Sequence, residues 1–156
     1  MAFKLLDKDH GYLAKLRAIR SLDGRVKAKA GLIGSAASEQ HDDKSGLTTA
    51  QIGAIHEFGV GVPERSFIRT WFDENKPLIN EKLQELARDV IALNGTIYDK
   101  MELFGEWAEG QIRARIEAGI SPPNSPATIA RKGSDIPLID TRKLIRAIAH
   151  EVARES

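Results

Sequence analysis

The chain has no cysteine, few aromatic residues and no long apolar segment. The absence of cysteine excludes disulfides and thiolate metal sites, and it is typical of proteins of a reducing cytoplasm. No apolar run approaches the roughly 20 residues that a membrane helix requires. Lys4 and Lys8 are not followed by the long apolar stretch of a signal peptide. We therefore expect a protein that is made and used without crossing a membrane.

The length and composition indicate a single globular domain spanning residues 1–156. The chain is 42% hydrophobic and 29% charged, which is ordinary for a soluble protein, and a chain of this size can bury a core. The net charge of +1 is unevenly distributed: residues 1–33 carry +5, residues 34–106 carry −6 and residues 107–156 carry +2. Such a bipolar chain favours head-to-tail contact between copies or stacking on a differently charged partner. Chance scatter over a solvated surface is the alternative interpretation.

Hydrophobic periodicity predicts a helix and then a strand in the first quarter of the chain. Residues 9–22 repeat an apolar side chain at every third position, which is typical of an amphipathic helix. Residues 25–33 alternate apolar and basic side chains, which predicts a half-buried strand with a basic outer face. Residues 34–47 are polar and without periodicity, and we expect a flexible loop there.

The next segment carries a clear helix start signal. Thr48 and Gln51 have the spacing of a capping box, in which each side chain satisfies a backbone N–H of the other residue. We expect this helix to end near Phe58, with Gly59 as a left-handed cap. Gly53 lies inside the helix, and close approach of another backbone would explain a glycine there.

Two long helices and a terminal strand complete the predicted fold. Ser66 is expected to open a helix that Pro77 interrupts, and apolar stripes then mark helices on both sides of Asn94-Gly95, the second starting at Thr96. Residues 119–126 read as a stiff proline-rich linker, and Ser125 as the cap of a short helix. A helical turn near Leu144 and an alternating segment at 147–154 follow. We predict an α+β fold in which strands 25–33 and 147–154 form a small antiparallel sheet packed against a long helical hairpin and shorter helices.

No complete catalytic, metal or cofactor motif accompanies these elements. His56-Glu57 begins like a zinc-protease helix, but Val60 occupies the position of the second histidine. The glycines of residues 59–62 lack the third glycine of a dinucleotide fingerprint, and residues 132–134 lack the spacing of a P-loop. We therefore predict a protein that is not an enzyme and that has no metal and no cofactor.

Two groups of side chains each admit two interpretations. Phe67 and Trp71 lie four residues apart on one helix face, which is most often a core position, but large aromatics on a stiff turn also serve as interface anchors. Arg25, Lys27 and Lys29 project from one strand face, where they either decorate a solvated surface or contact phosphates through charge.

Three segments resemble those of one protein family. Residues 55–59 (IHEFG) precede residues 62–69 (VPERSFIR), and residues 122–133 (PPNSPATIARKG) precede residues 137–144 (PLIDTRKL). In order and spacing this pattern resembles the tail-completion (neck) proteins of tailed bacteriophages, also called virion-morphogenesis proteins. The resemblance extends over residues 25–154.

The resemblance implies a small α+β protein without catalytic activity that assembles as a ring, a hexamer, at the head-proximal end of the tail and helps to join head and tail. Its expected partners are copies of itself and other neck and tail proteins, such as the tail terminator, the tail tube or the head-completion protein. Genomic DNA would pass through the lumen without sequence-specific contacts. The expected location is the virion, after assembly in the cytoplasm of the bacterial host.

The resemblance also suggests which residues form contacts. The interface candidates are His56, Glu57, Phe58, Gly59, Pro63, Arg65, Phe67, Arg69, Asp140 and Thr141. We further expect Arg25, Lys27 and Lys29 to face the lumen or an adjacent ring. The family usually has glycine after the Asp-Thr pair, where this chain has Arg142. If that position needs a positive φ, arginine there costs about 1 kcal/mol or more.

Three alternatives remain open from the sequence. One is a nucleic-acid-binding module that uses the basic amino-terminal third. Another is a hydrolytic enzyme whose site is dispersed along the chain. Within the phage interpretation, a minor tail or head-connector protein is a further alternative, because the sequence does not specify the position of a ring.

Overall fold

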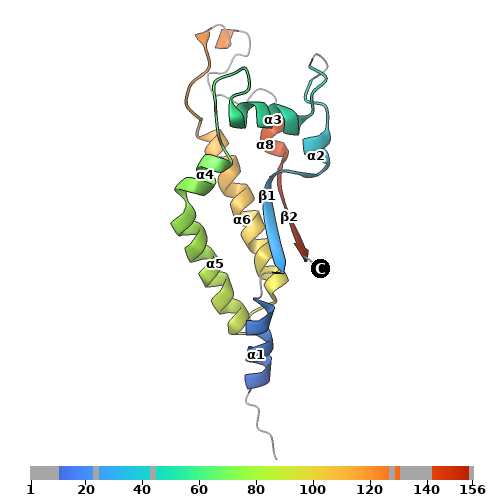
Figure 1. Cartoon of the computed structure of the whole chain (residues 1–156), viewed down its shortest axis with the longest axis vertical. Helices are drawn as coiled ribbons and strands as arrows, with labels where there is room; N and C mark the ends of the chain where they lie inside the picture. Colours follow the sequence, from blue (N-terminus) through green and yellow to red (C-terminus); the bar gives the residue numbers. More distant parts are fainter. Residues whose placement is uncertain (1–10, 23–24, 43–44, 127–128, 131–141, 155–156) are drawn as a thin grey trace, which may run out of the picture.

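The computed structural model describes residues 11–22, 25–42, 45–126, 129–130 and 142–154. Its elements follow in the order α1 (Tyr12–Ser21), β1 (Val26–Leu32), α2 (Gly34–Ser38), α3 (Thr49–Phe58), α4 (Arg69–Glu74), α5 (Lys76–Ile91), α6 (Ile97–Glu117), α8 (Lys143–Arg146) and β2 (Ile148–Arg154). Figure 1 shows an elongated molecule in which α2, α3 and α8 gather at one end and α1 lies at the other. Both strands pack against α6. This is the predicted α+β fold.

The two strands form an antiparallel sheet from opposite ends of the chain. Val26 pairs with Arg154 and Leu32 pairs with Ile148, with five further pairs between them. In β1 the exposed positions alternate with half-buried ones, and Lys27 and Lys29 lie on the exposed face. The pairing predicted between residues 25–33 and 147–154 is therefore confirmed, together with its basic outer face.

The α5–α6 hairpin is the long helical pair predicted from the apolar stripes. Thr96 starts α6 with a capping box, in which its hydroxyl accepts the N–H of Asp99 at 3.2 Å and its own N–H donates to the Asp99 carboxylate at 2.9 Å. Leu93 lies past the end of α5, exposed, with a φ of 65°. It takes the left-handed position that usually follows a helix end, since Asn94 N–H bonds back to Asp89.

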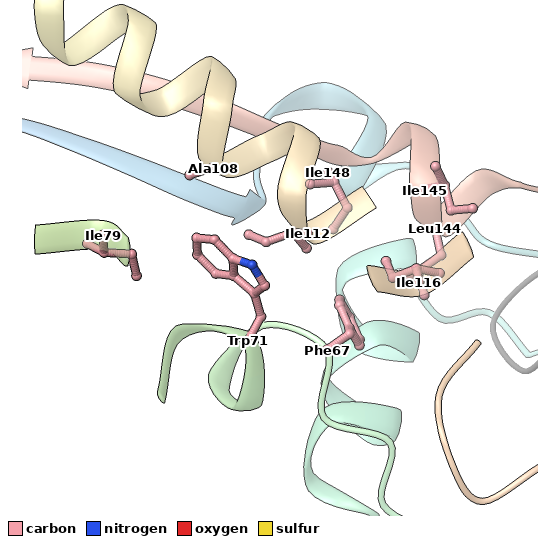
Figure 2. Close-up of a cluster of buried hydrophobic side chains, with 9 residues drawn as sticks. All are labelled: Phe67, Trp71, Ile79, Ala108, Ile112, Ile116, Leu144, Ile145 and Ile148. Atoms are coloured by element: carbon pink, nitrogen blue, oxygen red, sulfur yellow. The ribbon is translucent and has the colours of Figure 1, made fainter. Parts of the chain in front are cut away.

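The core lies where α4, α6, α8 and β2 meet. Figure 2 shows its buried side chains converging from these elements, from α5 and from the segment before α4: Phe67, Trp71, Ile79, Ala108, Ile112, Ile116, Leu144, Ile145 and Ile148. Phe67, Ile116 and Ile148 are 0% exposed. Burial of one such side chain stabilises a fold by about 1.5–3 kcal/mol. The last elements of the chain thus share one core with the hairpin, and Phe67 and Trp71 follow the core interpretation.

Helix α3 begins and ends as its sequence predicts, but Gly53 has a different neighbour. Thr48 and Gln51 make both bonds of the capping box, and Gly59 ends the helix with a φ of 68°. A Cβ on Gly53 would lie 2.0 Å from Cδ1 of Leu32. The expectation of a close backbone is therefore wrong: the side chain of Leu32 in β1 fills the space above this glycine.

Two predicted boundaries differ from the structure. The segment 34–47 is not a loop throughout, because its first five residues form α2, whose Ala37 is 3% exposed and helps to pack α2 onto α3 and α8. Helix α4 begins at Arg69 and not at Ser66, and the N–H groups of the residues just before it donate to Glu57. Pro77 lies in the first turn of α5, where a missing N–H costs no helical bond.

Helix α1 carries its apolar stripe outside the core. The helix predicted at 9–22 is present at Tyr12–Ser21 and has no buried residue. Leu13, Leu16 and Ile19 are each between 44% and 49% exposed. The periodicity therefore predicted the helix correctly, whereas the burial of its apolar face does not occur within the described part of the chain.

Candidate interface at the turn between α3 and α4

The turn between α3 and α4 is organised around the buried carboxylate of Glu57. Oε1 accepts the hydroxyl of Ser66 at 2.7 Å and the N–H of Arg69 at 2.8 Å. Oε2 accepts the N–H groups of Phe67 at 2.8 Å and Ile68 at 3.1 Å. Glu57 is 6% exposed. One side chain at the end of α3 thus satisfies the backbone donors at the start of α4 and fixes the angle between the two helices.

The hydrogen bonds keep Glu57 ionised despite its burial. Burial raises the pKa of its carboxyl group, because the charged form loses hydration. The bonds from Ser66 and from the backbone of Arg69, Ile68 and Phe67 lower the pKa by more, so that it lies below the ordinary value of 4.5. A carboxylate with four donors and a lowered pKa is a poor general base.

This environment bears on the possibility of a nucleophilic serine. Ser66 donates to Glu57 and also accepts the N–H of Thr70 at 3.1 Å, so its hydroxyl is engaged on both sides. Ser66 is 7% exposed. The Ser66–Glu57 pair therefore has the contacts of a helix cap and not those of a serine activated by a base.

Arg65 ties the same turn to the proline-rich linker. Its Nε donates to the carbonyl of Pro122 at 2.8 Å, and its terminal nitrogen donates to the carbonyl of Pro123 at 3.2 Å. Arg65 is 6% exposed. The planar guanidinium can span two successive carbonyls, which lysine cannot do with the same geometry. The segment 119–126 is thus held against the turn, more than fifty residues away in sequence.

The opposite side of the turn presents aromatic and apolar groups to solvent. Phe58 is 61% exposed and Val60 is 64% exposed. The guanidinium of Arg69 lies 5.4 Å from the ring centre of Phe58, in the arrangement of a cation–π contact, and it also pairs with Glu64. Phe72, 50% exposed, follows Arg69 by one helical turn. We call Phe58, Val60, Arg69 and Phe72 the turn surface.

The predicted interface residues therefore divide into two sets. Glu57, Arg65 and Phe67 lie inside the chain. Gly59 makes the sharp turn between them, and a Cβ there would lie 3.1 Å from the backbone of Glu64. Phe58, Pro63 and Arg69 are exposed, and His56 is half-buried. The first set positions the second. Asp140 and Thr141 lie outside the described residues.

The basic residues predicted to face a lumen or an adjacent ring lie together on the sheet. Lys27 and Lys29 are exposed on one face of β1, and Arg25 directly precedes the strand. Lys29 pairs with Glu151 of β2 at 2.9 Å. The structure brings these three residues to one surface, separate from the turn surface.

Sequence reasoning missed the roles of Ser66, Val60 and Phe72. Ser66 carries no signal in the sequence, because its partner Glu57 lies nine residues earlier and is brought to it only by the fold. Val60 and Phe72 have no signal either, because an exposed apolar residue is common in any surface.

A second polar cluster lies between α6 and β2. His150 contacts the carboxylate of Glu109 through Nδ1 at 2.6 Å and that of Glu102 through Nε2 at 3.3 Å. The hydrogen bond with Glu109 is the main cause of a raised pKa of His150, although burial lowers it. A Cβ on Gly105 would lie 2.6 Å from the imidazole, so this glycine makes room for the ring. Within the part of the chain that the structure describes, no group of three acidic, histidine or cysteine side chains is arranged to hold a metal ion.

Comparison of the chain with models of known families, with curated proteins and with solved structures found no match. Among the helices of the described residues, none combines the length and the apolar character needed to cross a membrane.

Proposed function

We propose that this protein is a structural component of a tailed-phage virion, a neck or tail-completion protein that forms a ring at the head-proximal end of the tail. It acts by packing against copies of itself and against neighbouring virion proteins, and it makes or breaks no covalent bond. The proposal starts from the segments that resemble this family and is supported by the geometry of the turn between α3 and α4.

The observation that carries the proposal is the combination of a rigid support with an exposed aromatic surface. Glu57 and Arg65 fix the turn from inside through six hydrogen bonds, while Phe58 and Arg69 stand outside it. Aromatic residues and arginine are enriched in the centres of protein interfaces, and a preformed surface loses little entropy on binding. A surface of this kind suits a ring subunit, which packs against its neighbours.

A ring requires two different complementary surfaces on each subunit, because head-to-tail contacts close only by rotation. The turn surface lies at the end of the molecule where α3 is located, and the exposed stripe of α1 lies at the opposite end (Figure 1). Two separate exposed apolar regions are consistent with heterologous contacts, in which one surface of a subunit meets a different surface of the next.

The mass of the purified protein, measured alone and after mixing with tail tubes, tests the proposal. We expect a ring of six copies, alone or on the tubes, and loss of that ring in Phe58→Ser. Leu103→Ser is the matched control, since Leu103 is 49% exposed on α6, away from the turn. Both variants should melt within a few degrees of the wild type.

Two outcomes would reject the proposal. One is a wild-type protein that stays monomeric both alone and with tail tubes. The other is a Phe58→Ser variant that assembles as well as Leu103→Ser, since the turn surface would then not form the contact.

A further inference from the structure

Within the residues that the structure describes, the sheet has two strands, so each strand is paired on one side only. Every second residue of such a strand turns its N–H and C=O away from the partner strand. Unpaired edges of this kind are templates for another strand, and folded proteins usually cover or interrupt them. The two edges of this sheet differ in that respect.

The outer edge of β2 is partly covered by side chains of α6. Arg113 donates to the carbonyl of Ile148 at 2.6 Å, and the hydroxyl of Tyr98 donates to the carbonyl of Val152 at 3.3 Å. These two carbonyls therefore point away from β1. Ile148 and Val152 are separated by an even number of residues, so in an antiparallel ladder their backbone groups point to the same side.

The register then identifies the outward-facing residues of β1. Val152 pairs with Ala28, and Ile148 pairs with Leu32. In a non-hydrogen-bonded pair, both residues point their N–H and C=O groups away from the partner strand. Ala28 and Leu32 therefore point these groups outward. By alternation, Val26 and Ala30 also face outward. Among the described residues, no backbone hydrogen bond from outside the sheet reaches Val26, Ala28 or Ala30.

Apart from the charges of Lys27 and Lys29, the outer edge of β1 has no feature that would prevent pairing. The strand β1 is regular: it pairs with β2 over seven consecutive residues without a bulge, and it contains no proline. The side chains at Ala28 and Ala30 are small. At the far end of the strand, Leu32 packs over Gly53 of α3, so the accessible stretch is Val26–Ala30.

The charges beside this edge select the partner. A strand added here would place its own side chains next to Lys27 and Lys29 on the exposed face. A second copy of β1 would place lysines beside lysines, which is unfavourable, whereas acidic side chains would be attracted. Glu151 already shows this pairing on the other side, where it lies 2.9 Å from Lys29.

We propose that the outer edge of β1 binds an extended segment of another protein, in which acidic side chains alternate with small apolar ones. Main-chain bonds to Val26, Ala28 and Ala30 hold the segment, and Lys27 and Lys29 select its acidic face. This proposal does not depend on a phage function, and it assigns the basic surface of the sheet to a protein partner and not to nucleic acid.

The test uses the whole protein and a fluorescein-labelled peptide of alternating valine and glutamate, with binding followed by fluorescence anisotropy. We expect at least about tenfold tighter binding than for the matching valine–lysine peptide. Methylation of the peptide nitrogens that face β1 should abolish binding, because it removes the main-chain donors.

The variant Ala28→Pro tests the outer edge of β1 without disturbing the pairing of β1 with β2. The N–H of Ala28 points away from β2, so proline there should leave the ladder intact and block the added strand. The expected result is an unchanged circular dichroism spectrum and melting temperature with at least about tenfold weaker peptide binding. If Ala28→Pro does not fold, Lys27→Glu replaces it and should reverse the preference between the two peptides.

The proposal is overturned if the glutamate peptide binds no better than the lysine peptide, or if a folded Ala28→Pro variant binds it as well as the wild type. It is also overturned if duplex DNA binds at the same surface, displaces the peptide and is unaffected by Ala28→Pro, since the lysines would then serve phosphates.

Discussion

The carboxylate of Glu57, in the last turn of α3, accepts the backbone N–H of Arg69, the first residue of α4, over 2.8 Å. Three more donors from the intervening segment reach the same carboxylate. A single acidic side chain thus replaces the local cap that α4 lacks.

Removing this carboxylate should be among the most costly single substitutions in the chain. We expect Glu57→Ala to lower the free energy of unfolding by about 3–4 kcal/mol, because buried N–H groups lose their acceptor. Glu57→Gln keeps the shape but not the charge and should cost about 1–2 kcal/mol. Urea denaturation measures both, with Glu64→Gln on the exposed side of the turn as a control. A loss below about 1 kcal/mol in Glu57→Ala would contradict this account.

Glu57 should also make stability depend on acid. Its pKa is lowered in the folded chain, so its contribution is complete above the ordinary value of 4.5 and is lost as the pH falls through the lower native value. The difference in unfolding free energy between the wild type and Glu57→Gln should therefore shrink between neutral pH and about pH 3. An unchanged difference over that range would show that the carboxylate is not preferentially ionised in the native state.

Two glycines inside helices should respond to alanine in opposite directions. In Gly53→Ala the new methyl group would meet Leu32, and we expect a loss of about 1–3 kcal/mol. In Gly110→Ala the methyl group meets nothing within 4 Å, and the helix should gain up to about 1 kcal/mol. The melting temperatures of the two variants test both expectations. A stabilised Gly53→Ala variant would contradict the close contact between this position and the side chain of Leu32.

Arg142 occupies a conformation that suits glycine. Its φ is 57° at the start of α8. This is the positive φ at which arginine is expected to cost free energy relative to the glycine that the phage family usually has there. Arg142→Gly should stabilise the chain by about 0.5–1 kcal/mol, because the left-handed strain outweighs the added entropy of the unfolded chain. Arg142→Ala keeps the strain and is the control. Equal unfolding midpoints for these two variants would count against the assigned backbone conformation.

His150 should make the protein less stable in alkali. Its pKa is raised by Glu109 and Glu102, so the contact of the charged ring stabilises the fold fully below the ordinary value of 6.5 and is lost as the pH rises through the higher native value. The wild type should therefore lose stability relative to His150→Gln between about pH 6 and 9. Thermal melts of the two proteins at several pH values in that range measure this difference. An opposite trend, or no trend, would contradict the prediction.

Features written in local sequence were predictable. The capping box at Thr48 and the helix start at Thr96 depend on residues within one turn of each other, and both are present as expected; Thr96 also forms a capping box that was not predicted. The pairing of the terminal strands could also be predicted, because two alternating segments in a largely helical chain have few other partners. The resemblance to a phage family adds a function to this fold, and that function stays a prediction.

Features that depend on distant contacts were missed. Glu57 meets its donors only after the turn has folded, and nothing in its sequence position distinguishes it from a surface acid. Leu32 lies above Gly53 because β1 packs against α3, so the reason for that glycine could not be read from α3 alone. The same limit applies to the exposed apolar face of α1, because hydrophobic periodicity predicts a helix but not the element that packs on its apolar face.

The pairing of β1 with β2 has a consequence for biosynthesis. Leu32 is synthesised long before its partner Ile148, and at about 5–20 residues per second the delay is roughly 6–23 s. During that interval the nascent strand has both edges open, while the helical hairpin can already form from local contacts. The sheet is thus completed only after β2 has been synthesised, so until then the nascent β1 is the segment most in need of protection from other strands.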